Sequence, residues 1–144
     1  MHVAVDDRTR LAYVEVLADQ QGQTAAGFTA RALAWLAGLG VQVERVLTDN
    51  GWCYRSAAFQ QVLAEAGARH LRTRPYRPQT NGKAERFNRT LATEWSYARL
   101  YTSNQARRAA LAGWLHYYNH HRPHTALEGK SPMQLLNNLP GNYS

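Results

Sequence analysis

The chain has 144 residues, of which 44% are hydrophobic, a net charge of +7 and a single cysteine. This size suits one domain with a real core, and the lone Cys53 excludes an intramolecular disulfide framework or a cysteine-rich zinc site. No apolar run approaches the roughly 20 residues that span a bilayer, and the first residues lack the regions of a signal peptide, so we expect a cytoplasmic protein with no membrane partner.

The apolar pattern predicts an α/β alternation. Strands are expected at residues 2–5, 11–17, 43–47 and 70–73. Helices are expected around residues 28–39, 59–66, 81–99 and 111–118, with a short last helix from Ser131. The first two strands are joined by a polar turn and should form a hairpin. We expect residues 1–144 to be a single domain with a helical tail at about 103–138.

A carboxylate directly follows the third predicted strand. The apolar run that ends at Thr48 continues into Asp49, Asn50 and Gly51. Open α/β sheets keep their active sites at the carboxyl ends of strands, where such a turn begins. Asp49 is therefore a candidate catalytic or metal-binding residue. The alternative is that its side chain only caps the turn.

A basic stretch surrounds one acid where a loop becomes a helix. Glu85 is the only carboxylate between Ala66 and Thr93. Its basic neighbours are Arg72, Arg74, Arg77, Lys83, Arg86 and Arg89. Residues 1–70 carry six basic against seven acidic side chains, whereas residues 71–144 carry eleven against three. A local excess of this kind is typical of a surface that holds a polyanion by its phosphates. The alternative for Glu85 is a surface pair with Arg89, one helical turn further on.

Three segments carry a family resemblance. They run from Thr48 to Gly51, from Pro78 to Asn88 and from Tyr118 to His124, and 35 residues separate Asp49 from Glu85. In order and spacing they resemble the integrase-core branch of DDE-type transposases of bacterial insertion sequences, which is similar to the catalytic core of retroviral integrases. The resemblance extends over about residues 2–136.

The resemblance implies a ribonuclease H-like mixed sheet flanked by helices. In that fold three strands precede the first helix, and the first of them carries a further catalytic aspartate. Only two strands precede the first helix here, so the first strand is apparently missing and its aspartate would lie upstream of Met1. Asp6 and Asp7 align with a turn, and we expect Asp6 to accept local backbone hydrogen bonds.

The resemblance also implies a function: metal-dependent cleavage and transfer of DNA strands. It assigns Asp49 and Glu85 as catalytic residues and as ligands of Mg²⁺ or Mn²⁺. It implies partners, namely DNA at the element ends and target and further copies of the chain, and a nucleoid-associated location in the cytoplasm. The expected DNA contacts are Arg74, Arg77, Asn81, Lys83, Arg86 and Arg89. Without the first aspartate this fragment would be inactive, and the alternative function is a non-catalytic DNA-binding or assembly fragment derived from a transposase.

Histidines gather near the end of the chain, where zinc binding is the alternative to weigh. His120, His121 and His124 lack paired cysteines, and Arg122 and Pro123 interrupt the helix between them. We expect a structural role instead, in which Arg122 or His124 docks the tail onto the core.

Overall fold

The structure is a computed structural model in which residues 1–72, 82–96 and 103–138 are described. The chain divides into two compact units. The first contains the described residues 1–4, 14–72 and 82, and the second contains 5–13, 83–96 and 103–138.

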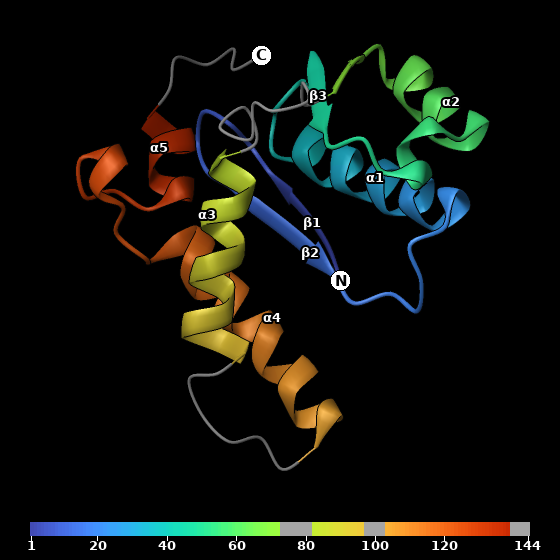
Figure 1. The fold of residues 1–144 in the computed structure, drawn as a ribbon. Coiled ribbons are helices and arrows are strands. Elements are labelled where there is room, and N and C mark those ends of the chain that lie inside the picture. The colour runs from blue at the N-terminus through green and yellow to red at the C-terminus, as the bar shows by residue number, and fades with distance from the viewer. Residues whose placement is uncertain (73–81, 97–102, 139–144) are drawn as a thin grey trace. The chain divides into compact units, whose positions relative to one another are not determined.

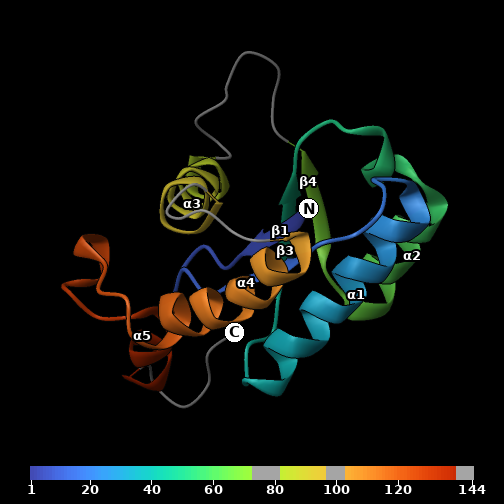
Figure 2. The ribbon, with the colours of Figure 1, turned by 90° about the horizontal axis from the view of Figure 1, so that it is seen from below.

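The first unit is built around a strand–helix–strand element. Its elements in chain order are α1 (Gly22–Gly38), β3 (Arg45–Thr48), the short helix η1 (Trp52–Arg55), α2 (Ala57–Ala66) and β4 (Arg69–Arg72). Strands β3 and β4 pair in parallel, with Arg45 opposite Arg69 and Thr48 opposite Arg72. Helices α1 and α2 lie side by side (Figures 1 and 2).

Local signals at both ends explain why α2 forms where the sequence predicts it. Ser56 precedes the helix, and its Oγ accepts a hydrogen bond of 3.1 Å from the backbone N–H of Phe59. Gly67 ends the helix in the left-handed conformation, with φ of 70°. Phe59 is fully buried and packs with Leu63 against α1. The helix thereby covers the strand pair that carries Asp49.

The predicted hairpin is present. Strand β1 (His2–Val5) pairs with β2 (Ala12–Glu15), and the two form a sheet separate from β3 and β4. The open end of the hairpin belongs to the first unit and its turn to the second. The described strands thus give two two-stranded sheets, a hairpin and a parallel pair.

The second unit is mainly helical. Its elements in chain order are α3 (Gly82–Leu91), the π-helical turn η3 (Ala92–Ser96), α4 (Asn104–His120), the short helix η4 (Thr125–Leu127) and α5 (Pro132–Asn138). Phe87 is 2% exposed, and its ring lies 5.0 Å from Tyr118 and 5.9 Å from Trp114. This aromatic cluster joins α3 to α4.

Several predicted boundaries differ from the structure, and two of the differences have a clear physical reason. The third strand was expected at residues 43–47 and is observed at Arg45–Thr48, because β4 offers paired partners only for that range. The helix expected at 81–99 is regular only to Leu91, where η3 follows, and residues 97–99 lie outside the described part of the chain. In η3 the Trp95 indole N–H donates 2.9 Å to the carbonyl of Arg107, so the wider turn ties this segment to α4.

Candidate metal site and nucleic-acid interface

Asp49 stands exposed at the carboxyl end of β3. Its Oδ1 accepts a hydrogen bond of 2.7 Å from the backbone N–H of Gly51, so the carboxylate does cap the turn. A Cβ on Gly51 would lie 2.9 Å from that oxygen, closer than ordinary contact allows. Glycine is therefore what lets the carboxylate fold over the turn. The second oxygen, Oδ2, accepts no hydrogen bond from the described residues, which leaves it able to bind a cation.

The side chains next to this turn stay neutral. Burial raises the pKa of Tyr54 to about 12, and burial likewise raises the pKa of the Cys53 thiol. Cys53 is half-buried and packs against the core of the first unit. The turn therefore offers a carboxylate without a thiolate nucleophile.

Glu85 lies exposed in the first turn of α3, on a different face from buried Phe87. The predicted accessibility of Glu85 is confirmed. Among the described residues, Glu85 makes no ion pair with Arg89, so the surface-pair alternative does not describe this structure. Arg86 and Arg89 are also exposed, and neither pairs with a described carboxylate. The helix thus presents one acid and two unneutralised bases to the solvent.

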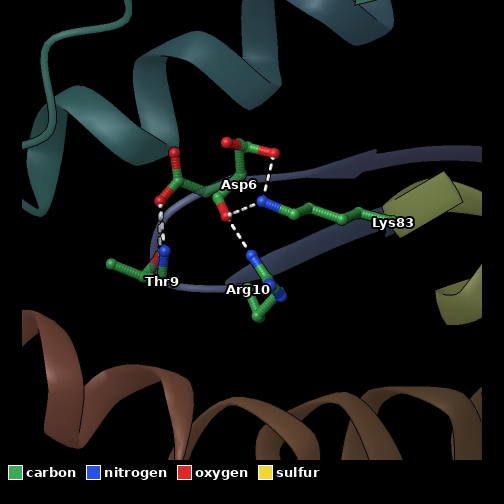
Figure 3. A network of polar contacts seen from close by, with 5 residues as sticks. Asp6, Thr9, Arg10 and Lys83 are labelled. Atoms are coloured by element: carbon green, nitrogen blue, oxygen red, sulfur yellow. Dashed lines mark hydrogen bonds and ion pairs between the residues drawn. The ribbon is translucent and has the colours of Figure 1, made fainter. Parts of the chain in front are cut away.

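Lys83, on the same helix, is already engaged. Its Nζ lies 2.5 Å from Oδ1 of Asp7 and donates 2.9 Å to the backbone carbonyl of Asp7, in the hairpin turn (Figure 3). Asp7 is 86% exposed, and a pair this open to water stabilises little. Sequence spacing gave no sign of this contact, because 76 positions separate the two residues.

Asp6 is a turn residue, as predicted. Its Oδ2 accepts hydrogen bonds from the backbone N–H of Thr9 at 3.0 Å and from the Thr9 hydroxyl at 2.6 Å (Figure 3). The Asp6 carbonyl accepts from the N–H of Arg10 at 2.9 Å. These contacts hold the hairpin turn together. They give the Asp6 carboxylate a structural role within the turn.

The predicted site residues fall in different parts of the chain. Asp49 belongs to the first unit and Glu85 to the second, so their convergence on one ion stays a prediction. Three of the predicted DNA contacts lie outside the described residues, namely Arg74, Arg77 and Asn81.

The C-terminal segment docks onto the rest of the second unit, as predicted. The Arg122 guanidinium donates to the Glu94 carboxylate through Nη2 at 2.7 Å and through Nε at 3.0 Å. The hydrogen bonds from Arg122 lower the pKa of Glu94, and Glu94 in turn raises the pKa of Arg122. Glu94 was not singled out from the sequence, since its partner lies 28 positions away.

The histidines divide into two groups. The His124 ring stands edge-on to Tyr118 at 4.9 Å, which supports the structural role. The rings of His116 and His120 stack near the end of α4 with centroids 4.5 Å apart, and the His121 ring stands edge-on to His116 at 5.4 Å. Within the described ranges no three histidine, cysteine or acidic side chains are placed to hold a metal ion.

His124 should make the second unit sensitive to acid. Burial, then the charges of Arg122 and Arg10, lower its pKa to about 4, against about 6.5 in the unfolded chain. Between these values the unfolded state binds the extra proton, so stability falls as the pH drops through that window. The ring is partly exposed, so we expect wild type to lose only about 1 kcal/mol more than His124→Phe between pH 7 and 5. Urea unfolding at both pH values measures this difference, and equal losses would contradict it.

Trp52 follows the Asp49 turn and is 88% exposed. An indole this exposed contributes little to the core and has a free face for stacking.

Among the described residues, no helix combines the length and apolarity needed to cross a membrane.

Comparisons with known proteins agree with this geometry. Two family models, both described as Integrase core domain, match residues 1–78 and 66–132. The transposase InsD of an IS2 insertion element of Escherichia coli is 32% identical over 90 residues, which are 62% of this chain and 30% of that protein. A putative integrase of a Spiroplasma virus is 25% identical over 148 residues, covering 94% of this chain and 41% of that protein. The chain thus spans less than half of these relatives.

Solved structures give the same fold. A chain of the simian T-cell lymphotropic virus intasome, solved with a PP2A regulatory subunit, superposes with a TM-score of 0.75 at 26% identity, over 99% of this chain and 50% of that one. The HTLV-2 integrase catalytic core domain in complex with magnesium superposes with a TM-score of 0.68 at 20% identity, over 92% of this chain and 81% of that one. The predicted ribonuclease H-like α/β class is confirmed. The first family match covers more than half of the sequence, and the chain therefore belongs to the integrase core family of transposases and retroviral integrases.

Proposed function

We propose that this chain is the catalytic core of a DNA transposase, which cuts and joins DNA strands at the ends of a mobile element. The observation that carries the proposal is a pair of exposed carboxylates inside the matched segments. Asp49 directly follows β3 and Glu85 lies in the first turn of α3, each without a strong competing partner among the described residues. We further propose that residues 1–144 work as one domain, because the β1–β2 hairpin contributes to both units.

The donor set suits a hard divalent cation. Carboxylate oxygens are the ligands that Mg²⁺ and Mn²⁺ prefer, and Asp49 and Glu85 would hold the ion. When bound, such an ion activates the attacking oxygen and stabilises the leaving oxygen of phosphoryl transfer. Gly51 keeps the Asp49 carboxylate folded over its turn, so one oxygen is fixed by the backbone. That arrangement orients the other oxygen for a ligand.

The exposed bases of α3 would hold the DNA by its phosphates. Arg86 and Arg89 are the described candidates with unneutralised charge, and Lys83 would exchange its weak pair with Asp7 for a phosphate. Arg74, Arg77 and Asn81 complete the proposed surface. The intasome and the HTLV-2 core, which was solved in a trimeric form, motivate a further proposal: the active assembly contains several copies of the chain.

Residues 1–144 alone should not transfer strands. Two-metal phosphoryl transfer needs more ligands than two carboxylates, and Asp6 is engaged within its own turn. An assay of 3′ processing with Mg²⁺ checks this expectation. Robust cleavage by these residues that disappears in Asp6→Asn would make Asp6 the third carboxylate and overturn the assignment.

Metal binding tests the central assignment. Asp49→Asn and Glu85→Gln should each weaken Mn²⁺ binding by about tenfold or more, because each removes one anionic ligand. Isothermal titration calorimetry measures the affinity. Glu44→Gln is the matched control, since it removes one exposed carboxylate next to β3 and should leave the affinity unchanged. Equal affinities in all four proteins would reject the site.

A further inference from the structure

A chain of hydrogen bonds links α2 to the strand end that carries Asp49. Gln60 Nε2 lies 3.0 Å from the carbonyl of Tyr54 and 3.0 Å from Nδ1 of His70. The other ring nitrogen of His70, Nε2, lies 2.8 Å from the hydroxyl of Thr48. That hydroxyl in turn lies 2.8 Å from the backbone carbonyl of Asp49. Three of these contacts connect the helix to the candidate ligand, and all four lie within the first unit.

One backbone carbonyl determines which atom donates and which accepts in each of these hydrogen bonds. The Tyr54 oxygen can only accept, so the Gln60 atom facing it must be the NH₂ group. The same NH₂ group faces Nδ1 of His70, which must therefore accept and carry no hydrogen. The ring proton of neutral His70 then sits on Nε2 and is donated to the Thr48 oxygen. Thr48 has one hydroxyl hydrogen, and it goes to the carbonyl of Asp49.

The surroundings of His70 hold the ring in this state. Its ring makes a T-shaped contact with the ring of Phe59, with centroids 5.1 Å apart. Burial, and then the charge of Arg72 on the same strand, lower the pKa of His70. The groups that face it from β3 and α2 are Thr48, Gln60 and Phe59, none of which is charged. The His70 ring is therefore neutral and held in one orientation.

We propose that His70 is a positioning residue for Asp49: its Nε2–H directs the Thr48 hydroxyl onto the Asp49 carbonyl and so fixes the strand end. Asp49 is then held at two points, its carbonyl by Thr48 and its Oδ1 by the N–H of Gly51. The inference rests on the proposed function only where it takes Asp49 as the metal ligand. The state of the ring and the rigidity of the turn are properties of the first unit itself.

The protonation state can be observed directly. Two-bond ¹H–¹⁵N correlation spectra of the labelled chain near neutral pH should show His70 as the Nε2–H tautomer. Gln60→Glu supplies a second observation, because Gln60 is exposed and its replacement is nearly isosteric. A carboxylate facing Nδ1 should draw a proton to that nitrogen and change the ring signals. A wild-type ring protonated only on Nδ1, or a ring unaffected by Gln60→Glu, would overturn the proposal.

Two variants separate positioning from packing. His70→Phe keeps the ring against Phe59 and removes the donor, whereas His70→Gln restores an N–H near the position of Nε2. His70→Phe should weaken Mn²⁺ binding by about tenfold, and His70→Gln should recover most of the loss. If His70 acts only by packing, His70→Phe should instead bind Mn²⁺ more tightly than His70→Gln. Amide exchange of Gly51 should likewise be faster in His70→Phe than in His70→Gln.

The exchange measurement needs no metal. A wild-type chain that fails to bind Mn²⁺ would therefore reject the proposed function while the Gly51 exchange rates still decide the role of His70. The positioning role would be rejected if His70→Phe had the same Gly51 exchange rate and the same Mn²⁺ affinity as wild type.

Discussion

Replacing Asn119 with leucine is expected to lower the free energy of unfolding by about 3 kcal/mol. Asn119 is buried at the end of α4. Its side-chain amide makes the two backbone hydrogen bonds that a neighbouring strand would otherwise make. Its Oδ1 accepts 2.9 Å from the N–H of Ala12, and its Nδ2 donates 3.0 Å to the carbonyl of Ala12. Ala12 is 2% exposed, so water cannot replace the lost partners. Leucine fills a similar volume but leaves two buried backbone groups unpaired, at about 1 to 3 kcal/mol each.

Urea unfolding followed by circular dichroism measures this loss. Asn137→Leu is the matched control, because Asn137 is exposed on α5 and the same substitution there should change stability by less than about 0.5 kcal/mol. A loss below about 1 kcal/mol in Asn119→Leu would mean that the backbone of Ala12 finds other partners.

DNA affinity is expected to fall about 250-fold when the salt concentration rises from 50 to 200 mM. Phosphate contacts release counterions, and four or five such contacts give a slope of about −4 in a plot of log affinity against log salt. Arg86→Ala and Arg89→Ala should each reduce the slope by about one, because both side chains are exposed and unneutralised on α3. Lys83→Ala should have a smaller effect, since Asp7 already offsets its charge.

Fluorescence anisotropy with a labelled duplex measures the slope. Arg31→Ala is the matched control, because it changes the net charge equally but removes an arginine held by Glu15 through two contacts of 2.8 Å. A flat salt dependence would reject phosphate contact, and an equal loss in Arg31→Ala would assign the effect to net charge alone.

Local signals in the sequence were enough to predict most elements. Ser56 and Gly67 bracket α2 because a cap and a left-handed glycine act within one turn of the helix. Likewise Phe87 indicated which face of α3 is buried, and so predicted that Glu85 is exposed. Boundaries that depend on a partner strand were less accurate. The start of β3 is set by Arg69, which no local pattern around Arg45 contains.

The site was predictable only where one segment defines it. Asp49 followed from its place after an apolar strand, and its turn contact follows from Gly51, two positions away. The contacts of Lys83 with Asp7 and of Thr48 with His70 join positions 76 and 22 apart. Contacts at such separations are made by the tertiary fold, and composition or periodicity carries no record of them.

The exposure of Trp52 gives the Asp49 turn an optical signal of its own. The other described tryptophans are more buried, and Trp95 is only 6% exposed. A neutral quencher such as acrylamide therefore reaches Trp52 first, and the quenched part of the emission comes mainly from one indole three positions from Asp49. Cations or DNA at this turn would change that fraction, so occupancy of the candidate site can be followed in the unlabelled chain.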